Sequence, residues 1–127
     1  MTAEIVHALM QTAERAAVQA DIASNAATNA RRVWVSAAIR VAEAVANDGA
    51  PLDIDVAAYV NCRANWIDAM NDAREASARE RDARRVSECA EREWNEEVRG
   101  VADSLAEDLA NERALQEAET EKEANNA

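Results

Sequence analysis

The chain has very little of what usually ends or replaces a helix. Its 127 residues include no Phe, one Tyr, two Gly and one Pro, whereas 32 positions are Ala. Gly and Pro mark turns, and aromatic and β-branched residues favour strands, so few signals for β structure remain. Ala, Glu and Arg are good helix formers. The composition therefore predicts an all-α protein, and the length predicts one domain over residues 1–127.

The residue types that carry most catalysis and metal binding are also scarce. His7 is the only His, and Cys62 and Cys89 are the only cysteines, with no CxxC spacing. Neither a zinc site nor a disulfide framework is indicated by this spacing. A Glu-x-x-His di-iron bundle is excluded on the number of ligands. No glycine-rich nucleotide loop and no GxSxG nucleophile motif occurs. We therefore expect no enzymatic activity, no cofactor and no bound metal.

Positive charge is scarce as well. Thirteen Arg and one Lys stand against 25 acidic residues, and a net charge of −11 would repel a polyphosphate backbone. We therefore expect no direct binding to nucleic acid. The acidity is densest after Gly100, where eight acids face two bases.

Long apolar runs are missing too. No run approaches the length of a membrane span, and residues 1–20 lack the apolar core of a signal peptide. The expected compartment is the cytoplasm, or the host cytoplasm if the chain is viral, with no membrane contact.

What the chain does have is helical spacing of apolar and small residues in two long stretches. They predict a helix over about 3–47, capped by Thr2, and a helix over about 54–99. Polar residues at 24–29 compete for backbone hydrogen bonds, so a break there is an alternative. The first stripe is Ile5, Leu9, Ala13, Ala16, Ala20, Ala23, Ala27, Ala30, Trp34, Ala37, Val41 and Ala44. The second is Val56, Tyr59, Val60, Ile67, Met70, Ala73, Ala76, Ala83, Val86, Ala90, Trp94 and Val98.

A loop over residues 48–53 separates these stretches. Gly49 can take the left-handed conformation that follows a helix, and Pro51 forbids the helix to continue. So short a loop makes the helices antiparallel neighbours, with residue i facing roughly residue 100 − i. Trp34 then meets Trp66 and Ala27 meets Ala73, so large faces large and small faces small. The charged stretch 74–93 is thereby predicted to be one wall of this hairpin.

The chain after residue 99 allows two interpretations. The preferred one places a turn at 100–103, a third helix over about 104–121 and a frayed tail at 122–127. Ser104 and Glu107 have capping-box spacing, and Leu105, Leu109 and Leu115 would be the apolar contacts of that helix. The alternative continues the second helix through Gly100, because one internal Gly costs only about 1 kcal/mol.

A seam of alanines buries little area, so it stabilises a hairpin weakly at ~25 cal/mol per Å². The hairpin is therefore expected to pack against a third helix, a second copy or another protein. One hypothesis is an acidic interaction module that docks on a larger protein, such as a nucleic-acid-handling one, and blocks or tethers it. In general type this resembles phage-encoded inhibitors of host defence, including anti-CRISPR proteins, some of which place carboxylates where phosphates would bind. The alternative is a structural homo-oligomer, such as a homodimeric coiled coil or a scaffold subunit.

Candidate partner-binding residues follow from these hypotheses. Carboxylates of the acidic segment could meet a basic groove, and Trp is the residue most enriched at interface hot spots. The candidates are Glu107, Asp108, Glu112, Trp34, Trp66 and Trp94.

Overall fold

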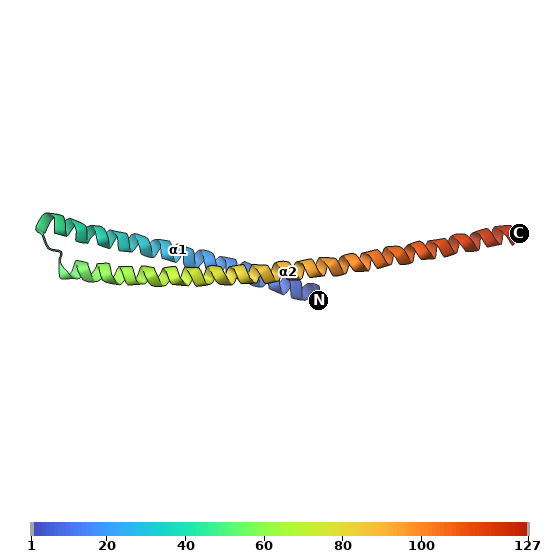
Figure 1. Ribbon diagram of the computed structural model, residues 1–127, viewed down its shortest axis with the longest axis horizontal. Coiled ribbons are helices and arrows are strands. Elements are labelled where there is room, and N and C mark those ends of the chain that lie inside the picture. Colours follow the sequence, from blue (N-terminus) through green and yellow to red (C-terminus); the bar gives the residue numbers. More distant parts are fainter. Residues whose placement is uncertain (1, 127) are drawn as a thin grey trace.

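Two helices make up the fold. The computed structural model describes residues 2–126, which form α1 (Ala3–Asp48) and α2 (Asp53–Asn126), joined by residues 49–52. The helices run antiparallel and pack against each other along α1, after which α2 continues alone (Figure 1). The prediction of an all-α protein built on two long packed helices is confirmed.

Both ends of α1 are closed by the residues that the sequence indicates. Thr2 has an extended backbone (φ −112°, ψ 156°), and its hydroxyl oxygen accepts a hydrogen bond from the Ile5 N–H at 3.3 Å. Gly49 is left-handed (φ 75°), and its N–H donates to the Val45 carbonyl at 3.1 Å. Inside the helix, the Thr28 hydroxyl donates to the carbonyl of Ser24 at 3.1 Å. This side chain bonds within the helix instead of interrupting it, so residues 24–29 stay helical.

The two glycines give a matched test of these backbone conformations. Gly49→Ala is expected to destabilise the hairpin by about 1 kcal/mol, because a Cβ is strained at positive φ. Gly100→Ala is expected to increase helicity instead, because Gly100 is helical and an added Cβ would meet nothing within 4 Å. Urea unfolding followed by circular dichroism measures both changes. Changes of the same sign would contradict the assigned backbone conformations.

The seam between the helices has unbroken heptad spacing. Along each helix the less exposed positions can be followed in alternating steps of three and four residues, the signature of a coiled coil. On α1 the seam is Val6, Leu9, Ala13, Ala16, Ala20, Ala23, Ala27, Ala30, Trp34, Ala37, Val41 and Ala44. On α2 it is Asp55, Tyr59, Cys62, Trp66, Ala69, Ala73, Ala76, Glu80, Ala83, Ser87, Ala90 and Trp94.

The register of the hairpin is set by its aromatic residues. The rings of Trp34 and Trp66 are stacked, with centroids 4.8 Å apart and planes 5° apart, and Tyr59 lies 6.3 Å from Trp34. The predicted pairing of Trp34 with Trp66 is therefore confirmed. In this register, each seam residue of α1 lies opposite one seam residue of α2, and the two residue numbers of every pair add up to 99 or 100. The spacing of Ala27 and Ala73 stays a prediction.

The predicted stripe of α1 is right except at its start, where Val6 is buried and Ile5 is 50% exposed. The stripe of α2 was less accurate. Its four valines at 56, 60, 86 and 98 are 38–55% exposed, whereas Cys62, Glu80 and Ser87 line the seam. Most seam positions are alanines, so the helices can approach closely where a side chain is short. The heptad position of a side chain therefore determines its burial more strongly than its apolar character does.

The prediction of a turn at 100–103 and a separate third helix is wrong. α2 is one helix from Asp53 to Asn126, and both Gly100 and the segment 104–121 lie inside it. The residues after Gly100 are mostly Ala, Leu and Glu, whose helix propensity outweighs the cost of about 1 kcal/mol for one Gly. The predicted fraying is not seen at 122–126, and residue 127 lies outside the described residues.

The continuous α2 separates the two cysteines. Both are free, and 27 residues of helix put them about 40 Å apart, whereas a disulfide needs Cα atoms within about 7 Å. Oxidation of the native protein is therefore expected to give no intramolecular disulfide. Mass spectrometry of a non-reduced digest checks this, and a Cys62–Cys89 peptide from the monomer would contradict a continuous α2.

Candidate protein-docking surface

The part of α2 that extends beyond the hairpin, residues 98–126, is called the overhang here. The register places Ala3, the first residue of α1, opposite about residue 97. Trp94 is the last half-buried residue, and all residues from 95 to 126 are exposed. In Figure 1 the overhang is the orange-to-red segment, which projects past the N-terminal end of α1. Within residues 2–126, nothing covers this length of helix.

The overhang carries an apolar stripe. Val98, Val101, Leu105 and Leu109 are separated by three or four residues, so they share one helical face. Their exposed fractions are 48%, 69%, 57% and 59%. The stripe starts four residues after Trp94 and borders the continuation of the seam, which it shares at Val101, seven residues after Trp94. We call these four residues the overhang stripe.

Leu115 was predicted to act together with Leu105 and Leu109. It is 62% exposed, and at 100° per residue it lies about a quarter of a turn away from their face. It is therefore not part of the overhang stripe.

The candidate carboxylates divide between two faces of the overhang. Asp108 and Glu112 are four residues apart and lie beside Leu105 and Leu109, on the face of the overhang stripe. Glu107 is two residues from Leu105, about 200° around the helix, and so lies on the opposite face. All three carboxylates are exposed. The structure thus groups Asp108 and Glu112 with the apolar stripe and sets Glu107 apart.

The three tryptophans also differ in position. Trp34 and Trp66 stack on each other within the seam, towards the closed end of the hairpin. The Nε1 atom of Trp34 is buried and has no hydrogen-bond acceptor among residues 2–126. Trp94 is the last seam residue at the open end, next to Val98. Trp34 and Trp66 therefore belong to the hairpin core, and only Trp94 adjoins the overhang stripe.

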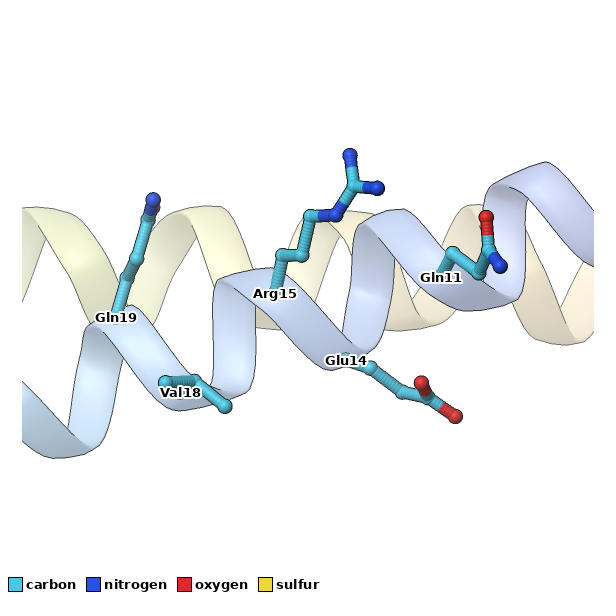
Figure 2. Close-up of a pocket in the computed structure, with 5 residues that line it drawn as sticks. All are labelled: Gln11, Glu14, Arg15, Val18 and Gln19. Carbon is cyan, nitrogen blue, oxygen red and sulfur yellow. The ribbon is translucent and has the colours of Figure 1, made fainter.

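Two shallow hollows lie on exposed faces of the helices. One lies on the outer face of α1, where Gln11, Arg15 and Gln19 point one way while Glu14 and Val18 point another (Figure 2). All five residues come from one helix and are exposed, so no enclosed reaction site exists there. The second hollow lies on the overhang and includes two residues of the overhang stripe. Its lining is Glu97, Gly100, Val101, Ser104, Leu105 and Asp108.

No group of side chains arranged for catalysis or metal binding is found in the part of the chain that the structure describes. His7 Nε2 lies 3.1 Å from the side-chain nitrogen of Gln11, in an exposed position. Over residues 2–126, no three His, Cys, Asp or Glu side chains are grouped so that they could hold a metal ion. The two helices likewise contain no stretch both long and apolar enough to cross a membrane. The overhang stripe is an exposed apolar face of a kind that packs against other helices.

The sequence already contained the signal for this surface. The spacing from Trp94 through Val98, Val101 and Leu105 to Leu109 is helical throughout. The preferred prediction assigned the leucines to a third helix that packs on the hairpin. What the prediction missed is that the stripe is uncovered.

Comparisons with protein-family models, with curated proteins and with solved structures found no match to this chain.

Proposed function

We propose that this protein is a non-catalytic, acidic helical interaction module, which docks on a larger protein through the overhang and blocks or tethers it. One observation carries the proposal: the overhang stripe is apolar, about half to two-thirds exposed, and uncovered within residues 2–126. Isolated helices are marginal in water, and most helices in proteins are stabilised by packing of an apolar face. A helix with such a face is suited to a groove on another protein.

Burial of the overhang stripe would supply part of the free energy of binding, and apolar side chains of the partner must supply the rest. Full burial of a Val or Leu side chain stabilises by about 1.5–3 kcal/mol, and the four residues are roughly half to two-thirds exposed. Covering the overhang stripe would then contribute about 5 kcal/mol before the entropic cost of association. Charged contacts at the rim would add association rate and specificity.

The acidic residues favour a particular kind of partner. The segment after Gly100 holds eight acids and two bases, which suits a basic surface on another protein better than a nucleic acid. A phage-type inhibitor of host defence, with carboxylates placed in a groove built for nucleic acid, is the narrower form of this proposal. It is supported by the acidity and exposure of the overhang.

Site-specific photocross-linking in the cells that naturally make the chain tests the proposal. A benzophenone amino acid at Leu105 is expected to give a defined adduct with another protein. The same group at Ala110, which lies about 140° from Leu105 around the helix, is the matched control. Adducts only between copies of this chain, or equal adducts from both positions, would refute docking through the overhang stripe.

A further inference from the structure

We infer that the overhang binds one amphipathic helix of its partner, a helix with an Arg- or Lys-rich edge that runs antiparallel to α2 in line with α1. This inference rests on the proposed function and specifies the chemistry and direction of the partner segment. It has two independent supports, which are the position of the overhang stripe beside the hairpin seam and the sign of the charge along it.

The first support is the position of the overhang stripe beside the interface already present. The seam of α2 passes through Ser87, Ala90 and Trp94, and Val101 lies seven residues after Trp94, at the next equivalent heptad position, with Val98 and Leu105 beside that line. Up to Trp94 this face is covered by α1, which runs antiparallel to α2 (Figure 1). The overhang stripe therefore lies on nearly the same side of α2 as the seam, where another helix can pack against it. The helix that fits is therefore one that extends the line of α1.

Antiparallel packing on α2 also fixes which end of the new helix adjoins α1. A helix antiparallel to α2 is parallel to α1, so its C-terminal end lies next to the N-terminus of α1. The negative end of one helix dipole then faces the positive end of the other, which is favourable. From residue 98 to residue 112 the available face is about 21 Å long, at 1.5 Å per residue. About four helical turns of partner fit there.

The second support is charge. Asp108 and Glu112 lie along the overhang stripe, and Glu119 and Glu123 follow on the same face at heptad-like steps. Residues 98–126 contain eight acids against three bases, namely Arg99, Arg113 and Lys122. A second copy of the chain would bring the same excess of negative charge to the interface, and like charges across an interface oppose pairing. A basic edge on the partner is complementary, so the charge favours another protein over a second copy.

Three synthetic 21-residue peptides test the inference against the full-length protein. The first has Leu and Ala at seam positions and Arg at flanking positions. The second has the same seam with Glu flanks, and the third has the composition of the first in scrambled order. At low salt, fluorescence anisotropy is expected to give at least tenfold tighter binding for the first peptide than for either of the others. Equal binding of the acidic peptide, or of the scrambled basic one, would overturn the inference.

Two substitutions locate the binding face. Leu109→Asp is expected to weaken binding of the basic peptide at least tenfold. Ala110→Asp introduces the same side chain at the neighbouring position on another face and is expected to leave binding within about twofold. Circular dichroism of both variants controls for lost helicity. If the two substitutions weaken binding equally, the overhang stripe is not the binding face.

Energy transfer tests the direction. Trp94 lies four residues before the overhang, whereas Trp34 and Trp66 lie towards the loop at the far end of the hairpin. A dansyl group at the C-terminus of the basic peptide is expected to receive more energy from tryptophan than one at its N-terminus. Trp94→Phe should remove that difference. Stronger transfer to the N-terminal label would overturn the antiparallel orientation.

Sedimentation of the protein alone tests the competing occupant. We expect a monomer over the micromolar range. A dimer that Leu109→Asp abolishes would assign the overhang stripe to a second copy and overturn the inference. If cross-linking at Leu105 captures another protein while the basic peptide has no advantage, the interaction module stands and the assigned partner chemistry is wrong.

Discussion

Replacing Trp34 by Ala is expected to lower the free energy of unfolding of the hairpin by about 3 kcal/mol. Trp34 is stacked on Trp66 at 4.8 Å and lies 6.3 Å from the ring of Tyr59. Aromatic pairs of this kind add stability beyond the area they bury. Most of the seam consists of alanines, each of which buries little area. The aromatic cluster is therefore a large share of what holds α1 to α2.

Urea unfolding followed by circular dichroism measures this loss. Val33→Ala is the matched control, because Val33 is the neighbouring residue and is 57% exposed, so its truncation should change stability by less than about 0.5 kcal/mol. Trp66→Ala and the double variant complete a double-mutant cycle. The sum of the two losses of unfolding free energy in the single variants should exceed the loss in the double variant. A Trp34→Ala loss no larger than that of Val33→Ala would show that the stacked pair does not stabilise the hairpin.

The hairpin could be predicted because several sequence signals agree on it. Thr2, Gly49 and Pro51 mark where the first helix begins and where it must stop, and their backbone preferences are local. The pairing of Trp34 with Trp66 follows once the loop is placed. These features depend on single residues with strong conformational preferences, which a sequence displays directly.

The seam of α2 was harder to predict because it contains both apolar and polar side chains. Glu80 lies in the seam with its carboxylate 3.9 Å from Arg84, and its side chain is only 28% exposed. Ser87 is buried, while Val86 next to it is 50% exposed. Where helices approach closely through alanines, a short polar side chain fits and a valine one position away faces solvent. A stripe predicted from apolar residues alone therefore contains partly different residues from the observed seam.

The overhang could not be predicted, because ending the helix at Gly100 and continuing it are too close in free energy for sequence analysis to separate. Ending the helix at Gly100 and continuing through it differ by about 1 kcal/mol of propensity, less than one packed side chain contributes. That balance also decided the candidate site. A turn would have grouped Leu105, Leu109 and Leu115 as contacts with the hairpin, whereas the continuous helix leaves Leu105 and Leu109 exposed beside Asp108.

Charge reversal on the overhang is expected to have the largest effect on binding kinetics. Changing Glu107, Asp108 and Glu112 to Lys shifts the local charge by six units and should slow association with the basic peptide by about 10- to 100-fold at low salt. Electrostatic steering acts mainly on the association rate, so the dissociation rate should change less. Lys is as good a helix former as Glu, so helicity should be kept. Stopped-flow mixing with the labelled peptide measures both rates.

Single reversals separate steering from contact. Asp108→Lys and Glu107→Lys change the charge equally, but Asp108 lies beside the overhang stripe and Glu107 on the opposite face, across a helix about 10 Å wide. At low salt both should slow association. At 0.15 M salt, where screening acts over about 8 Å, only Asp108→Lys should still weaken binding appreciably. If the triple variant associates as fast as the parent at low salt, the carboxylates of the overhang are only a solvated surface. The inference that the partner helix has a basic edge would then be wrong.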